Sequence, residues 1–196
     1  MNRWGIVCPG PSMNLYRSHR RIMSICPDVL VAVNGAILLP EWFDYWAMMD
    51  LEVFKSCAKQ YLPQAIEIQK PVLWVPERWE GDVQESSEVY SYFQKYQKET
   101  FPSTSNEALA QIIPFGKDIE WRERTMFVAI ALAAIRGAKE VHLFGVDLSG
   151  QGYFQVGLEN CRTRHTDKRW KEERFWLDRI TAACAQEGIS IIRETA

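Results

Sequence analysis

The chain has 196 residues, of which 47% are hydrophobic and 24% are charged, as in ordinary folded globular proteins. This composition excludes an intrinsically disordered chain, a collagen-like chain and a small disulfide-rich protein. The formal net charge of -2 excludes a global basic field that would attract nucleic acid or an anionic membrane. We expect a single domain over residues 1–196, because this length is typical of one domain.

Cysteines and apolar runs set further bounds. The five cysteines include no Cys-x-x-Cys pair and no Cys/His spacing typical of zinc, so we expect reduced, mostly buried thiols and no metal site. The longest apolar run, Met126–Ile135, is far shorter than the about 20 residues of a membrane span. The apolar stretch after Arg3 is interrupted at Pro9 before it reaches the length of a signal peptide. The expected location is therefore the cytoplasm.

Short apolar runs alternate with helical patterns along the chain, which is typical of βαβ units on a parallel sheet. The runs are apolar on successive residues, as expected where helices cover both faces of a sheet. The sequence therefore predicts a Rossmann-like α/β domain with a central, mainly parallel sheet flanked by helices. Its six expected strands are Trp4–Cys8, Val29–Val33, Tyr45–Met49, Val72–Val75, Val141–Phe144 and Ser190–Ile192.

Two helices have clear start and stop signals. The first is predicted over Thr125–Arg136, with Gly137 as its stop. The second begins near Asp167, a good N-cap, and ends at a glycine about twenty residues later. Residues 76–121 mix a helical pattern over Ser86–Glu99 with loop signals. We expect this segment to be a helical and loop insertion that acts as a lid.

Ligands of doubly wound sheets bind outside the carboxyl ends of the strands. After the first strand, a helix is expected from about Met13, and the turn before it offers backbone N–H groups and a positive helix dipole to a phosphate. A rigid turn with Ser12 as the helix N-cap is the alternative interpretation. This turn has the sequence Cys8-Pro9-Gly10-Pro11-Ser12.

Three further polar residues follow expected strands. Asn34 can hydrogen-bond a ribose, a base or a sugar, and the alternative is a plain Asn-Gly turn with Gly35. Asp50 fits a helix N-cap better than a ligand for a hydroxyl or a metal. Asp147 can hold a ribose or acceptor hydroxyl, and the alternative is a structural aspartate that accepts from loop amides.

The stretch Cys161–Arg169 holds a local concentration of positive charge. Such a stretch can bind a phosphate, and a solvated charged loop is the alternative. It contains His165, and a histidine, whose usual pKa is about 6.5, suits general acid or base catalysis. His142 instead lies inside an apolar strand, where a packed core histidine is the usual role. We therefore favour His165 as the catalytic group.

Four segments together carry a resemblance to a known family: Ile6–Ser12, Val33-Asn34, Arg122–Thr125 with Ala129–Ala131, and Gly137–Asp147. They resemble the single-domain bacterial sialyltransferases that use CMP-sialic acid, together with their relatives, the motility accessory factors and the archaeal pterin-pyrophosphokinase-like proteins. Short phage proteins have a similar pattern. The resemblance lapses between about Leu51 and Trp121, and the family usually has Asn where this chain has Pro9.

The resemblance implies a metal-independent glycosyltransferase that uses no cofactor. Its partners would be a nucleotide sugar, CMP-linked in the family, and an acceptor that carries a hydroxyl. His165 would be the general base that deprotonates this hydroxyl, and Tyr153 would assist the leaving phosphate. The residues implied at the nucleotide are Gly10, Pro11, Ser12, Asn34, Arg122 and Thr125, and the place of Asp147 after an expected strand adds that residue.

Two other functions fit the same sequence. One is a nucleotide-dependent diphosphate- or phosphotransferase, which magnesium-dependent activity with ATP would favour. The other is a non-catalytic, phage-type nucleotide-binding protein, which tight nucleotide binding without turnover would favour. The sequence specifies neither the donor sugar nor the acceptor, and it leaves a homo-oligomer open.

Overall fold

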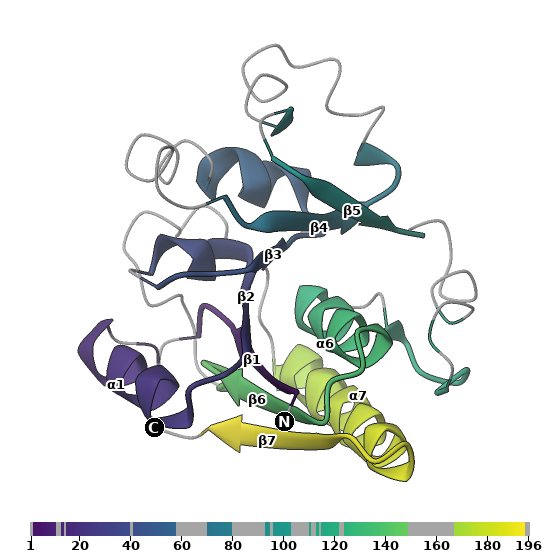
Figure 1. The fold of residues 1–196 in the computed structure, drawn as a ribbon. Coiled ribbons are helices and arrows are strands. Elements are labelled where there is room, and N and C mark those ends of the chain that lie inside the picture. Colours follow the sequence, from purple (N-terminus) through teal and green to yellow (C-terminus); the bar gives the residue numbers. More distant parts are fainter. Residues whose placement is uncertain are drawn as a thin grey trace.

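A computed structural model describes residues 2–10, 13, 15–39, 41–57, 70–79, 93–94, 96–102, 110, 113, 115–121, 124–148 and 167–194. These residues form one parallel sheet with the strand order β5-β4-β3-β2-β1-β6-β7 (Figure 1). Its strands are β1 (Arg3–Val7), β2 (Val29–Val33), β3 (Tyr45–Ala47), β4 (Val72–Pro76), β5 (Lys98–Phe101), β6 (Glu140–Phe144) and β7 (Ser190–Glu194).

The strand order reverses beside β1. From β1 to β5 each new strand is added on one side, and the chain then returns to the other side of β1 to form β6 and β7. This doubly wound, Rossmann-like α/β arrangement confirms the predicted fold class. It also places the carboxyl ends of all seven strands at one edge of the sheet, because every pairing is parallel.

The six expected strands are present, with ends that shift by at most two residues. Strand β5 was not expected, because Lys98–Phe101 is an edge strand with one fully buried residue and so lacks an apolar run. The helix predicted over Ser86–Glu99 is wrong at its end, where Lys98 and Glu99 belong to β5. Residues 80–92 lie outside the described part of the chain.

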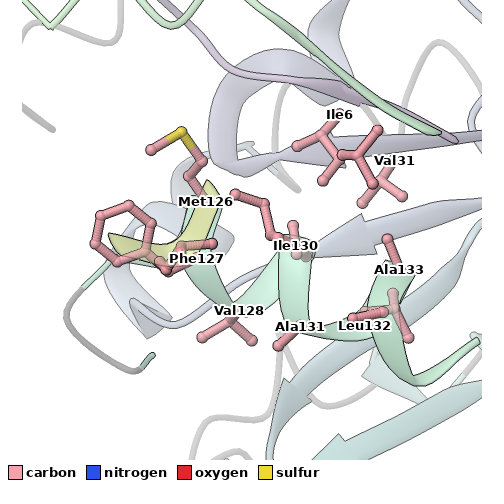
Figure 2. Close-up of a cluster of buried hydrophobic side chains, with 14 of the residues drawn as sticks. Ile6, Val31, Met126, Phe127, Val128, Ile130, Ala131, Leu132 and Ala133 are labelled. Carbon is pink, nitrogen blue, oxygen red and sulfur yellow. The ribbon is translucent and has the colours of Figure 1, made fainter. Parts of the chain in front are cut away.

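Helix α6 (Thr125–Ile135) is the central element of one sheet face, where it packs on β1, β2 and β3. Nine consecutive residues from Met126 to Ala134 are buried, so this helix is apolar on every side. Figure 2 shows Ile130 of α6 near Ile6 and Val31, which belong to the same core cluster. The predicted helix is confirmed.

Helix α7 (Asp167–Gln186) lies beside α6 on the same face and is amphipathic (Figure 1). Leu177, Ile180 and Cys184 of α7 pack in the core cluster of α6, and the start of this helix at Asp167 confirms the predicted one. The opposite face is covered by α1 (Leu15–Ile25) and by a helical segment at residues 51–57, which contribute to a second core cluster. Asp50 caps that segment as expected, because its Oδ1 accepts from the backbone N of Glu52 at 3.0 Å.

Helices α6 and α7 end in the same glycine motif. Gly137 and Gly188 have φ values of +76° and +73°, which an L side chain rarely adopts. After each glycine, a backbone N–H reaches back to the last turn, from Ala138 to Ala133 O and from Ile189 to Cys184 O, at 2.9 Å each. Each helix then turns into a parallel strand, so both helices start at the carboxyl edge of the sheet.

Cys8, Cys57 and Cys184 are buried thiols, and Cys26 is an exposed one. The prediction of mostly buried cysteines is thus confirmed for these four. None of the helices within the described ranges has the length and apolar character needed to cross a membrane.

Candidate functional site

The ends of β1 and β6 form the centre of the candidate site. Val7 pairs with Phe144 at the last position of both strands, and the Cys8 backbone N then donates to Phe144 O at 2.9 Å. The connection after β1 leads to β2, which neighbours β1 within the sheet, and β6 is the neighbour of β1 on its opposite edge. This is the topological switch point at which doubly wound sheets bind ligands.

Two glycines allow the loops after β1 and β6 to touch. A Cβ on Gly10 would lie 2.1 Å from Gly145 O and 2.2 Å from Asp147 Oδ2. Gly145 has a φ of +67°, and a Cβ there would lie 2.2 Å from Cys8 O. Both positions therefore require glycine for loop packing, whether or not a phosphate approaches the first loop.

Asp147 brings a carboxylate to this edge of the sheet. Its Oδ2 lies against the Gly10 backbone, and the residue is partly exposed. A carboxylate accepts hydrogen bonds and repels a second anion, so this part of the site suits a hydroxyl group better than a phosphate. The structure thus brings together Gly10 and Asp147, two of the predicted site residues.

Asn34 follows β2 and begins the short 3-10 helix η1 (Asn34–Leu38). Its φ is +50°, and its backbone O accepts a hydrogen bond from Trp46 Nε1 at 2.9 Å. Its side-chain Oδ1 is buried, yet it has no hydrogen-bond partner among the residues that the structure describes. A buried acceptor without a donor costs about 1–3 kcal/mol, so Asn34 is suited to accept from a bound ligand.

Thr125 is the first residue of α6 and is partly exposed at the carboxyl edge. Arg124 precedes it in an extended conformation at the N-cap position, where no side chain caps the helix. Arginine is an unusual N-cap, because the helix dipole places partial positive charge at this end. The first turn of α6 also lacks an acidic residue.

An ion cluster adjoins the start of α6. Glu173 of α7 is buried, and its Oε1 accepts from Arg124 Nε at 2.5 Å and from Arg169 Nε at 3.0 Å. Burial raises the pKa of the Cys8 thiol, and the nearby carboxylates of Glu173 and Asp147 raise it further. Cys8 is therefore a protonated thiol beside the cluster and is not suited to act as a nucleophile.

Sequence reasoning missed Arg124 and Glu173 and placed Arg169 only within a basic stretch. The signal for Glu173 was present, because the buried positions of α7 follow helical spacing through Glu173, Leu177, Ile180 and Cys184. A carboxylate on such a stripe predicts a buried partner of opposite charge.

Several predicted site residues lie outside the described part of the chain: Pro11, Ser12, Arg122, Tyr153 and His165. Their roles remain predictions. His142 is buried as expected, and its Nδ1 hydrogen-bonds Glu194 Oε1 at 2.7 Å on the sheet face that α1 covers. Across the described ranges, no group of three His, Cys, Asp or Glu side chains is arranged to hold a metal ion.

Comparisons with known proteins give one match, to a solved structure. No family model and no curated protein matches the chain. Among solved structures, the chain is similar to a MAf glycosyltransferase from Magnetospirillum magneticum AMB-1, with a TM-score of 0.51 and 12% sequence identity. The match covers 80% of this chain and 24% of that chain, so this chain spans about a quarter of its length. At this identity the likeness shows a shared α/β fold and no more.

Proposed function

We propose that this chain is a glycosyltransferase that moves a glycosyl group from a nucleotide sugar to an acceptor hydroxyl. The observation that carries the proposal is the buried Asn34 Oδ1, which lacks a donor among the described residues and lies at the carboxyl edge of a doubly wound sheet. Ligands bind at this edge, and nucleotides offer the N–H and O–H donors that such an oxygen needs. The shared fold with a MAf glycosyltransferase supports the same class of reaction.

The proposed donor site lies at the switch point. Asn34 accepts from the base or the ribose, and Asp147 accepts from a sugar hydroxyl. Thr125 and the uncapped first turn of α6 lie at the same edge and can donate to the nucleotide. We further propose that Gly10, Pro11, Ser12 and Arg122 complete this donor site.

The proposed chemistry is a substitution at the sugar carbon. The acceptor oxygen forms the new glycosidic bond while the bond to the nucleotide phosphate breaks, and the phosphate leaves with the bonding electrons. His165 removes the acceptor proton, and Tyr153 stabilises the leaving phosphate. A general base of this kind contributes typically about 10² to 10⁴ in rate. Metal independence and a CMP-linked donor belong to the proposal, and the sequence supports the former because it lacks an Asp-x-Asp pair.

A ligand screen followed by turnover tests this proposal. The screen contains CMP, UDP, GDP, ATP and their sugar conjugates. We expect at least one of these ligands to raise the melting temperature of the protein, because binding to the folded state stabilises it. With the conjugate that binds, release of free nucleotide should continue in EDTA and should fall at least about 100-fold in His165→Ala. Nucleotide binding by this variant should stay at the wild-type level.

Three outcomes contradict parts of the proposal. Binding without any release of nucleotide would identify a non-catalytic nucleotide-binding protein. Activity with ATP that requires magnesium would identify a phosphotransferase. Undiminished turnover by His165→Ala would remove the assigned base.

A further inference from the structure

Two arginines and one buried glutamate meet where α6 and α7 begin. The side chain of Glu173 is 8% exposed, whereas those of Arg124 and Arg169 are 18% and 26% exposed. Both arginines donate through Nε to the same carboxylate oxygen. The carboxylate therefore lies inside the protein, and the guanidinium groups are its more solvent-accessible partners.

This cluster borders the switch point. Both helices run toward the amino edge of the sheet and end in glycine motifs before β6 and β7, so Arg124 and Arg169 lie at the carboxyl edge. The carboxylates of Glu173 and Asp147 both act on the Cys8 thiol at the end of β1. Glu173 thus lies near the loops that carry Gly10 and Asp147.

The composition of the cluster suits an anion. A buried carboxylate requires a partner of opposite charge, and Glu173 holds its partners in fixed positions. Here two arginines converge, and one of them stands at the uncapped, positive end of α6. Positive side chains held at a positive helix end are the arrangement that an anion stabilises.

We propose that Glu173 is a positioning residue that holds Arg124 and Arg169 for a phosphate oxyanion of the nucleotide. The planar guanidinium group matches a phosphate with paired N–H donors, and an anchored guanidinium loses less freedom on binding. The basic cluster binds the phosphate, while Asn34 and Asp147 accept from the neutral parts of the ligand. The inference rests on the proposed function only for the identity of the ligand as a nucleotide.

Calorimetric titration of the full chain with cytidine, CMP and inorganic pyrophosphate tests this division of roles. At constant ionic strength, we expect Arg169→Gln to weaken CMP and pyrophosphate about tenfold or more, because each loses a charge-assisted hydrogen bond. Cytidine, which lacks the phosphate, should bind within about twofold of wild type. Arg174→Gln, an exposed position on the same helix, removes the same charge and should leave all three affinities within about twofold.

Two more variants separate positioning from folding. Arg169→Lys keeps the charge but loses the paired donors, so we expect an affinity for CMP below wild type and a cytidine affinity unchanged. Glu173→Gln should weaken CMP and pyrophosphate in the same selective way if the variant is folded. A structural role alone would change cytidine and CMP by the same factor in every variant, and that result would overturn the inference.

The titrations with the three ligands also distinguish this inference from the proposed function. Pyrophosphate binding that depends on Arg169, without binding of any nucleotide, would support the anion site and contradict the nucleotide donor. CMP that binds more tightly than cytidine by the same factor in wild type and in Arg169→Gln would support nucleotide binding and overturn the role of the arginines. No binding to wild type of pyrophosphate or of any of CMP, UDP, GDP and ATP would overturn both.

Discussion

Asn34 combines two unfavourable features at one residue. Its backbone lies in the left-handed region, and its buried side-chain oxygen lacks a donor among the described residues. Folded proteins satisfy most buried polar atoms, so each exception calls for an explanation. A ligand donor is the explanation that also fits the position of Asn34 at the carboxyl edge.

Replacing Asn34 by glycine tests this explanation, because the stability of the protein and its nucleotide affinity should respond differently. Glycine adopts the positive φ without strain and removes the unpartnered oxygen, so Asn34→Gly should leave the free energy of unfolding within about 1 kcal/mol of wild type. Nucleotide affinity should fall about tenfold with the lost hydrogen bond. Urea unfolding and calorimetric titration measure the two quantities. Equal nucleotide affinity in the variant would remove Asn34 from the site.

Gly10 is constrained by contact and Gly137 by conformation. In Gly10→Ala the new Cβ meets Gly145 O and the Asp147 carboxylate, so we expect a loss of about 3 kcal/mol, the upper range for overpacking. Gly137→Ala is the matched control, because a Cβ there has nothing within 4 Å and only its φ is strained. That variant should lose about 1 kcal/mol. Urea unfolding that ranks the two variants in the reverse order would contradict the close packing of the two loops.

At the scale of elements, α6 holds the sheet and the site together. Its buried residues contact three strands, and Trp74 Nε1 of β4 donates to Val128 O within the helix at 3.3 Å. Because the helix is apolar on all sides, its start at the carboxyl edge is set by core packing rather than by a cap.

Paired truncations in α6 test this packing. Ile130→Ala should lower the free energy of unfolding by about 2–5 kcal/mol, because Ile130 is fully buried in the core cluster. Ile135→Ala, at the exposed end of the same helix, is expected to cost under about 1 kcal/mol. Chemical unfolding of wild type and of both variants measures the two losses, provided that the variants keep the m-value of wild type. Equal losses in the two variants would contradict the buried setting of α6.

A charged network links β6, β7 and α1 on the opposite face. Glu194 accepts from His142 Nδ1 at 2.7 Å and from Arg21 Nη2 at 2.6 Å. Burial raises the pKa of Glu194, but the hydrogen bonds from His142 and Arg21 outweigh burial and hold this pKa below its usual range. The hydrogen bonds from Arg3 and His142 likewise lower the pKa of Glu140.

The lowered pKa of Glu194 predicts a loss of stability in acid. The folded state binds this proton less readily than the unfolded state, so the contribution is present above the ordinary glutamate pKa of about 4.3 and is lost as pH falls through the folded value. Glu194→Gln should therefore show a shallower fall of stability below about pH 4.3 than wild type. Glu187→Gln, at an exposed turn before β7, serves as the control. Parallel acid limbs for wild type and Glu194→Gln would contradict the network.

At the scale of the whole molecule, the sequence predicts the sheet well and its edge poorly. Strands buried on both faces, such as Val29–Val33, carry continuous apolar runs that sequence patterns detect. Lys98–Phe101 could not be recognised in this way, because an edge strand with mostly part-buried residues has no such run.

The candidate site was predictable only in part. Asn34 and Asp147 come shortly after recognisable strands, so a parallel sheet places both of them at its carboxyl edge. The Arg124–Glu173 contact joins residues 49 positions apart, and its partners are chosen by helix packing that one sequence does not reveal. The role of His165 depends on residues outside the described ranges and stays a prediction.

Hydrogen–deuterium exchange of the full chain, without nucleotide and with saturating CMP, UDP, GDP or ATP, tests most directly whether the switch point binds a nucleotide. We predict slower exchange in the peptides that cover residues 5–10, 31–38 and 124–130, because a ligand there protects the loops after β1 and β2 and the start of α6. Peptides that cover β5 and the carboxyl-terminal end of α7 should exchange at an unchanged rate. Protection confined to other segments, or no protection with CMP, UDP, GDP or ATP, would contradict the account.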